Sequence, residues 1–279
     1  MNHLQQTYVA IGGWFVLFLI LVGLLVGLSM IFCGLAVDLV GLALTFSIAP
    51  GVAAAFGSVV PFVALHREKI FTPTGGALFG GILLVACGVF LCAIAGRLRE
   101  RAQAQYRPIS SAAVRGLIYA VLSGTTAGLA NFGIAFGQAP IAIAESFGTR
   151  PSWAQNVIWM PMFLAALVPN VVYCSRLLRR NQTQSRFLAV ATTSHWALAA
   201  TMALVWLASL LLYGFAAARL GELGPVLGWP LFEAIIITTA SILGILTGEW
   251  KRSGKRPLKL QLSGVGLLIG AIVVFSRMH

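Results

Sequence analysis

Charged residues are scarce in this chain of 279 residues. Asp, Glu, Lys and Arg together make up 9% of the sequence, whereas an ordinary soluble domain carries about 25%. Hydrophobic residues reach 59%, and the mean hydropathy is +0.91. A water-soluble fold cannot bury that much apolar surface, so the composition excludes a soluble globular protein and predicts an integral membrane protein.

Acidic residues are especially few, with 7 Asp and Glu against 19 Lys and Arg, for a formal net charge of +12. In a soluble protein this excess would suggest a nucleic-acid partner. Here the basic residues lie in short loops beside apolar runs and are not interleaved with aromatic residues. We therefore expect no nucleic-acid binding and interpret the excess as a sign of orientation in the membrane.

Motifs for metal binding and catalysis are also missing. Cys33, Cys87, Cys92 and Cys174 fall inside apolar runs, and none has the paired spacing of a zinc or redox site. No Ser-His-Asp constellation, His-Glu-x-x-His motif, phosphate-binding Walker loop or dinucleotide fingerprint occurs. The sequence therefore predicts no metal, no cofactor and no enzymatic activity.

The sequence does contain long apolar runs without a charged residue. About 18 apolar residues without a charge are enough to cross roughly 30 Å of hydrocarbon. The runs predict an all-α polytopic membrane protein with about eight transmembrane helices, the first long enough to be tilted or broken near Gly34. The expected helices are Tyr8–Ala36, Val40–Ala64, Thr74–Gly96, Arg115–Gly137, Asn156–Leu177, His195–Ala217, Gly224–Thr247 and Leu260–Phe275.

Basic residues favour one side of the predicted membrane. That side carries Arg97, Arg99, Arg101, Arg107, Arg115, Arg176, Arg179, Arg180, Arg186, Lys251, Arg252, Lys255, Arg256 and Lys259. The opposite side carries only Arg67, Lys69, Arg150, Arg219 and Arg277. Because cytoplasmic loops are enriched in Lys and Arg, we expect the first set in the cytoplasm and both termini outside.

A weak internal repeat is also present. The segment Gly34–Gly41 resembles Gly214–Gly221 at an offset of 180 residues, and Pro50 falls on Pro230 at the same offset. Glu68 and Glu249, then Gly80 and Gly264, follow at offsets of 181 and 184 residues. The pattern predicts an incomplete 5+5 inverted repeat, with three helices in residues 1–100, a basic cytoplasmic linker at 101–114, and five helices in 115–279. Accidental similarity between Gly- and Ala-rich helices is the alternative.

Four stretches of the sequence carry a family resemblance. They are Gly248-Glu-Trp-Lys-Arg-Ser-Gly-Lys-Arg-Pro257; Thr74-Gly-Gly76 with Gly80, Gly88 and Gly96-Arg-Leu-Arg-Glu-Arg101; Arg115-Gly-Leu-Ile-Tyr-Ala-Val121 with Gly124; and Gly228-Trp-Pro230. In order and spacing they resemble the L-rhamnose/proton symporter family, within the drug/metabolite transporter superfamily of ten-helix carriers. Family members begin with two further helices, so the resemblance implies either a mis-assigned start or a reduced relative.

The resemblance also implies a function. It indicates sugar/proton symport by alternating access in the bacterial cytoplasmic (inner) membrane, with a small deoxyhexose sugar, the proton and membrane lipid as partners. A homo-oligomer is left open. The alternatives are a drug/metabolite-type carrier of another small solute, and a reduced membrane protein that packs with partners without transporting.

Glu233 is the residue that we expect to bind the coupling proton. It lies inside a predicted helix that has no other charge before Glu249. An ionised carboxylate at the centre of a membrane helix costs about 2.5–3.5 kcal/mol, so Glu233 should face a cavity or a partner, or carry a proton. The alternative is a protonated Glu233 that only hydrogen-bonds a neighbouring helix.

Amide, imidazole and indole side chains in the predicted helices are candidates for sugar binding. Hydroxyl groups of a sugar need hydrogen-bonding partners, and the apolar face of the ring packs against an aromatic plate. The candidates are Asn131, Asn170, His195, Trp206 and Trp229. The alternatives are interfacial tryptophans and asparagines that only join two helices.

Prolines within the apolar runs are candidate hinges. Pro50, Pro61, Pro161, Pro169 and Pro230 each remove one backbone N–H and loosen the helix one turn back. A static kink that neighbouring helices tolerate is the alternative.

Overall fold

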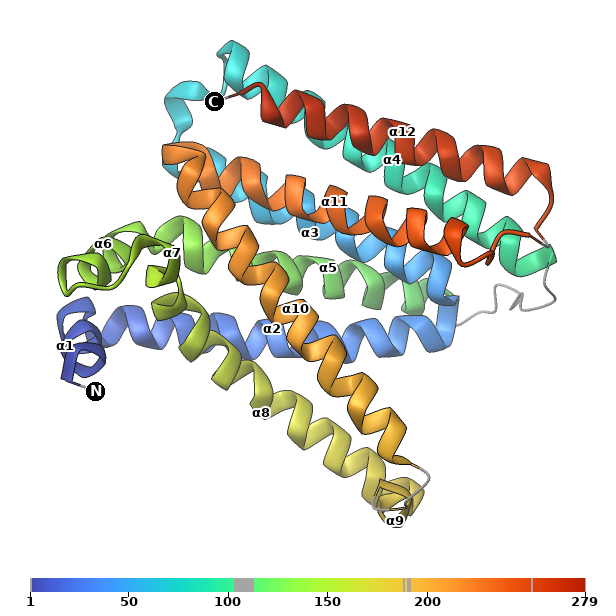
Figure 1. The fold of residues 1–279 in the computed structure, drawn as a ribbon, viewed down its shortest axis with the longest axis horizontal. Coiled ribbons are helices and arrows are strands. Elements are labelled where there is room, and N and C mark those ends of the chain that lie inside the picture. Colours follow the sequence, from blue (N-terminus) through green and yellow to red (C-terminus); the bar gives the residue numbers. More distant parts are fainter. Residues whose placement is uncertain (1, 103–112, 188, 190–191, 252, 279) are drawn as a thin grey trace.

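The fold is a bundle of long helices with several short ones at its ends (Figure 1). The computed structural model describes residues 2–102, 113–187, 189, 192–251 and 253–278. The elements in chain order are α1 (Asn2–Ile11), α2 (Gly13–Val40), α3 (Leu42–Leu65), η1 (Arg67–Lys69), α4 (Pro73–Ala102), α5 (Ala113–Phe136), α6 (Gln138–Ser146), α7 (Pro151–Ala154), α8 (Asn156–Asn181), α9 (Gln184–Phe187), α10 (Thr193–Arg219), η3 (Gly221–Leu223), α11 (Gly224–Leu246) and α12 (Lys255–Ser276).

In the described part of the chain, 8 helices are long and apolar enough to cross a membrane, namely α2, α3, α4, α5, α8, α10, α11 and α12. The shortest of them, α12, has 22 residues, and at about 1.5 Å of rise per residue it extends about 33 Å. The prediction of an all-α polytopic membrane protein with about eight transmembrane helices is confirmed.

The ends of the helices differ from the prediction in several places. Helix α2 does not break near Gly34 but continues to Val40, and the break lies earlier, at Gly12, whose φ is 88°. The last helix begins at Lys255 rather than at Leu260. The short helices α1, α6, α7 and α9 were not expected, because runs of 4 to 10 residues carry little periodic signal.

Helices α2 and α3 are joined by one residue, Gly41. Its φ of 86° lies in the left-handed region that glycine adopts readily, and it reverses the chain within one residue. The carboxylate of Glu100 accepts a hydrogen bond from the backbone N–H of Ala43 at 3.0 Å, which pairs one of the free amides at the start of α3. The end of α4 is thereby tied to the start of α3.

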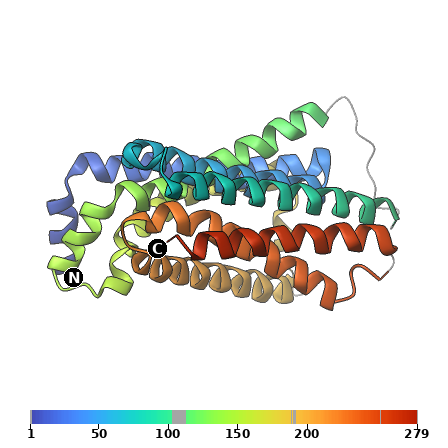
Figure 2. The same cartoon turned by 90° about the horizontal axis from the view of Figure 1, so that it is seen from above.

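One half of the bundle consists of α3, α4, α11 and α12. Helix α4 lies along α12, and α3 lies along α11, each pair antiparallel (Figures 1 and 2). The α4–α12 contact is close at two glycines, since a Cβ atom on Gly264 would lie 2.7 Å from the carbonyl oxygen of Gly88. Phe62, Leu78, Leu268 and Phe275 fill the core between these helices. The sequence repeat aligns the same helices, α3 with α11 and α4 with α12. Its division into three and five helices stays a prediction.

The other half consists of α2, α5, α8 and α10. Helix α2 packs against both α5 and α8, and α5 also packs against α3. Helices α8 and α10 extend away from the bundle and meet at α9 (Figure 1). We call the outer part of this hairpin the arm, defined as α8 from Val171, α9, and α10 as far as Ala208. Every described residue of α10 from Thr193 to Ala208 is exposed.

The predicted grouping of basic residues matches the two ends of the bundle. The end of α4, the start of α5, helix α9, the end of α11 and the start of α12 lie at one end (Figure 1). The helices α1, α6 and α7 lie at the other end, together with the last turn of α12. Arg107 and Arg252, which were assigned to the basic side, lie outside the described residues. The assignment of the basic end to the cytoplasm stays a prediction.

Replacing Gly264 with valine should destabilise the protein, because the added side chain overlaps the backbone of α4. Overpacking of this kind costs about 1–3 kcal/mol, so we expect a clearly lower melting temperature in detergent by scanning fluorimetry. The matched control is Gly266→Val on the same helix, where an added Cβ would meet nothing within 4 Å. Equal melting temperatures for the two variants would contradict the close α4–α12 contact.

Candidate functional site

Glu233 carries the only charge in α11 and lies one turn beyond the buried Trp229. Its side chain is half-buried. Within the described residues its carboxylate forms no ion pair and accepts no hydrogen bond. An unpaired carboxylate in the apolar part of a helix is costly in its ionised form. Uptake of a proton from the aqueous solution would therefore stabilise this position.

Trp229 connects α11 to α3. Its indole Nε1–H donates a hydrogen bond to the backbone carbonyl of Ala53 at 3.1 Å, and the ring fills the space beside Gly57. Because a Cβ atom on Gly57 would lie 2.7 Å from this ring, the glycine allows the indole to approach the α3 backbone. Trp229 therefore closes the contact between these two helices in the described conformation.

Asn131 joins four helices at the centre of the bundle. Its side chain is completely buried, and its amide nitrogen donates to the carbonyl oxygens of Gly57 and Pro225, both at 2.8 Å. The hydroxyl of Tyr213 donates to its amide oxygen at 2.5 Å. The Gly57 carbonyl is available because Pro61, four residues later in α3, has no N–H to donate to it.

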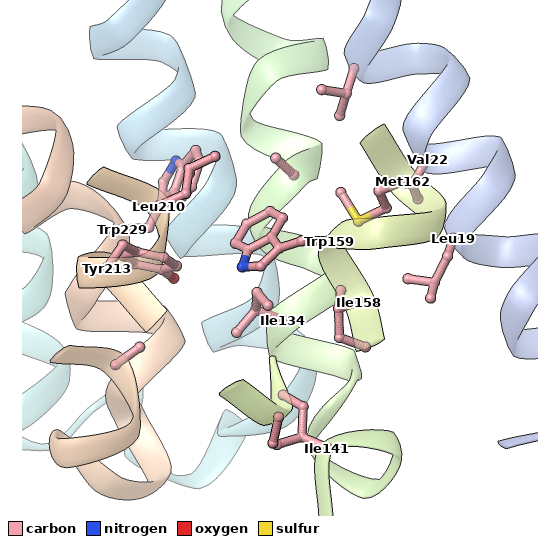
Figure 3. Close-up of a cluster of buried hydrophobic side chains, with 14 of the residues drawn as sticks. Leu19, Val22, Ile134, Ile141, Ile158, Trp159, Met162, Leu210, Tyr213 and Trp229 are labelled. Atoms are coloured by element: carbon pink, nitrogen blue, oxygen red, sulfur yellow. The ribbon is translucent and has the colours of Figure 1, made fainter. Parts of the chain in front are cut away.

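A continuous series of aromatic rings runs from this network toward the arm. Tyr213 contacts Trp229 and Trp159 edge-on, with ring centroids 5.5 and 6.3 Å away. Trp159 stacks on Phe163 at 5.3 Å, and Phe163 contacts Trp206 at 5.1 Å. Figure 3 shows Trp159 between the Tyr213 and Trp229 side chains and those of Ile158 and Met162. The rings thus connect α8, α10 and α11.

The indole N–H of Trp159 lies within this aromatic series and is buried without a hydrogen-bond partner among the described residues. An unpaired buried donor costs free energy, about 1–3 kcal/mol. A ligand hydroxyl placed against these rings would pair it.

The remaining two candidates lie away from Glu233. Asn170 is half-buried and donates to the carbonyl oxygens of Gly27 and Ala166, both at 2.9 Å, so that it joins α8 to α2. His195 is exposed at the start of α10, in the arm. The structure therefore connects Asn131, Trp206 and Trp229 through the aromatic series and places Glu233 one turn from Trp229 in α11. Asn170 and His195 lie apart from this series.

Sequence reasoning missed Tyr213, Trp159, Phe163 and Phe232. The first two carried a usable signal, because a tyrosine hydroxyl or indole N–H inside an apolar run needs a partner. Phe232 and Phe163 carried none, since phenylalanine is common in any membrane helix. Phe232 contacts both Tyr213 and Trp229, with centroids 5.4 and 5.7 Å apart, and directly precedes Glu233.

Two cavities with both polar and apolar lining lie near the ends of the bundle, within the described residues. One, of about 300 Å³, is lined by the carboxylates of Glu145 and Glu222 and the amides of Gln138 and Gln155, and it reaches Pro225, whose carbonyl binds Asn131. The other, of about 200 Å³, lies at the basic end beside Gly41. Among the described residues no three His, Cys, Asp or Glu side chains are placed to hold a metal ion.

The eight candidate membrane-spanning helices of the described residues, taken with the comparisons with known proteins, place the chain among multi-pass membrane transporters rather than enzymes. The family model of the L-rhamnose-proton symport protein (RhaT) matches residues 3–278. The chain belongs to that family, as the sequence motifs indicated.

Curated relatives support this assignment at low identity. The L-rhamnose-proton symporter of Escherichia coli is 23% identical over 262 residues, covering 91% of this chain and 76% of its own length. The symporter of Pectobacterium atrosepticum is 23% identical over 264 residues (91% and 74%), and that of Cronobacter sakazakii is 24% identical over 262 residues (91% and 76%). No solved structure matches the chain significantly.

Tyr213→Phe should destabilise the protein, because it leaves the buried amide oxygen of Asn131 without a donor. Such an unpaired group costs about 1–3 kcal/mol, and we expect a lower melting temperature in detergent. Tyr119→Phe is the matched control, since the Tyr119 ring stacks on Phe32 while its hydroxyl has no hydrogen bond in the described part of the chain. If both variants have the melting temperature of the wild-type protein, the Asn131 network does not hold the helices together.

Proposed function

We propose that the protein carries a small sugar of the L-rhamnose type together with a proton across the bacterial cytoplasmic membrane, by alternating access. The half-buried, unpaired carboxylate of Glu233, one turn from Trp229 in α11, carries this proposal. The family membership and the named function of the curated relatives, L-rhamnose-proton symport, support it.

Glu233 binds the coupling proton in this proposal. When the site faces water, the carboxylate exchanges protons with the solution, and when the site closes, the neutral acid avoids the cost of a buried charge. Ionised Glu233 therefore opposes closure over a bound sugar, so the sugar does not cross without the proton. The empty carrier returns after both have left, with the carboxylate facing the water that replaces the sugar.

The sugar binds against the aromatic series, with Trp206 and Trp229 as plates for the apolar face of its ring. The unpaired indole N–H of Trp159 supplies a donor for a sugar hydroxyl. Asn131 is the proposed hydrogen-bonding residue at this site, whereas Asn170 and His195 lie apart from the aromatic series in the described conformation. Because Asn131 already donates to the backbone carbonyls of Gly57 and Pro225, its contact with sugar requires the helices that it joins to separate.

Alternating access requires one group of helices to move against another. Close glycine contacts hold α4 to α12 in one half and, at Gly23 and Gly27, α2 to α8 in the other, whereas the arm packs against little. We propose that α8 and α10, with α2, tilt against the α3–α4–α11–α12 half. Pro161 and Pro169 lie in α8, and the carbonyl of Val157 that Pro161 leaves free accepts instead from the Tyr8 hydroxyl at 3.1 Å.

Glu233→Gln should abolish accumulation of the sugar, because glutamine is neutral at every pH and cannot couple closure to protonation. We expect labelled L-rhamnose to accumulate in proteoliposomes under an imposed inward proton gradient with wild-type protein, and the Gln variant to reach only the level seen without a gradient.

The control for this experiment is Glu68→Gln, an exposed carboxylate in η1, which should transport as wild type does. Gradient-driven accumulation undiminished in the Glu233 variant would remove its proton role. No gradient-dependent uptake by the wild-type protein, reconstituted in monodisperse form, would overturn sugar/proton symport itself.

Trp206→Ala should weaken sugar binding by about twofold to tenfold, since an aromatic contact contributes about 0.5–1.5 kcal/mol. Binding of labelled L-rhamnose to the purified protein measures the change. Trp153→Ala is the control, because Trp153 and Trp206 are both 49% exposed and Trp153 lies outside the aromatic series. An equal loss in the two variants would argue against a specific role for Trp206.

A further inference from the structure

The basic residues at one end of the molecule fall into two settings that differ in their counter-charges. On the bundle, Arg99 pairs with Glu249 at 2.6 Å, and Arg97 lines one cavity with Asp38 and Glu100. The arm has no such counter-charges, because no acidic residue occurs in the sequence between Glu145 and Glu222.

Four arginines lie on the arm. Arg176, Arg179 and Arg180 are spaced by three and four residues and so share one face at the end of α8, and Arg186 follows in α9. All four are exposed, and no carboxylate contacts them in the described part of the chain. Four uncompensated guanidinium groups form a site for anions, and guanidinium binds phosphate in a two-point geometry.

The arm is also built for a membrane surface. The ring of Trp196 packs edge-on against Phe187 at 5.8 Å, and its indole N–H donates to the Phe187 carbonyl at 3.0 Å. Both rings are about half exposed, as is usual for aromatic residues at the level of lipid headgroups. Beyond them the exposed flank of α10 is apolar, including Leu198, Met202 and Val205.

We propose that the arm binds an anionic phospholipid, with the headgroup phosphate on the arginines of α8 and α9 and the acyl chains along the exposed flank of α10. Charge complementarity selects the headgroup, and the apolar flank distinguishes a lipid from a free phosphate. None of these arginines belongs to the proposed sugar and proton site, and the proposal stands whether or not the protein transports a sugar.

Native mass spectrometry of the detergent-purified protein tests this proposal. We expect phosphatidylglycerol to be retained in preference to phosphatidylcholine with the same acyl chains. The variant Arg176→Gln/Arg179→Gln/Arg180→Gln/Arg186→Gln should retain about tenfold less phosphatidylglycerol, because the charge that attracts the headgroup is gone.

The matched control removes four positive charges from the same end of the molecule but outside the arm. It is Lys251→Gln/Lys255→Gln/Arg256→Gln/Lys259→Gln, and these four residues are also exposed. The control should keep the preference. An equal loss in both variants would reduce the effect to net charge and overturn the arm site.

Two measurements on the unchanged protein keep the test independent of how the variants fold. Equal retention of the two lipids by the wild-type protein would overturn the proposal. Displacement of phosphatidylglycerol by soluble glycerol 3-phosphate would also overturn it, since the arginines would then bind the phosphate group without the acyl chains.

Discussion

Hydrocarbon offers no hydrogen bonds, and this constraint organises the interior of the protein. A backbone group within the membrane that its own helix leaves unpaired must find another partner. Pro61 leaves the carbonyl of Gly57 without its helical donor, and Asn131 supplies the replacement while also binding Pro225 and Tyr213. In the same way, Pro161 leaves the carbonyl of Val157 in α8 without its helical donor, and the hydroxyl of Tyr8 supplies the replacement. The helices are thus joined where their own hydrogen bonding is interrupted.

Much of the fold could be predicted from the sequence, because each membrane helix records its length in an uncharged run. Short helices such as α6 and α9 leave no such record, and the end of α2 depends on the left-handed conformation of Gly41. Which helices touch could not be predicted either. The contact between Gly88 and Gly264 depends on a distance across the bundle that neither local sequence contains.

The candidate site was predicted in part. Glu233 and Trp229 could be found because charge and indole are conspicuous in an apolar helix. Asn131 could be found as a polar residue, but its three hydrogen bonds to α3, α10 and α11 depend on the packing. Asn170 and His195 had the same chemical signal as Asn131 and lie elsewhere, which shows that residue type alone does not place a side chain. The repeat and the assigned roles stay predictions.

The connection between α2 and α3 has a mechanical consequence. Only Gly41 separates Val40 from Leu42, so the two helix ends stay within one residue of each other, and neither helix can slide along its axis without displacing the other. Glu100 extends this linkage to α4 through the amide of Ala43. Translation of α2 would therefore be converted into rotation about this corner, and the opposite ends of the two helices would travel furthest.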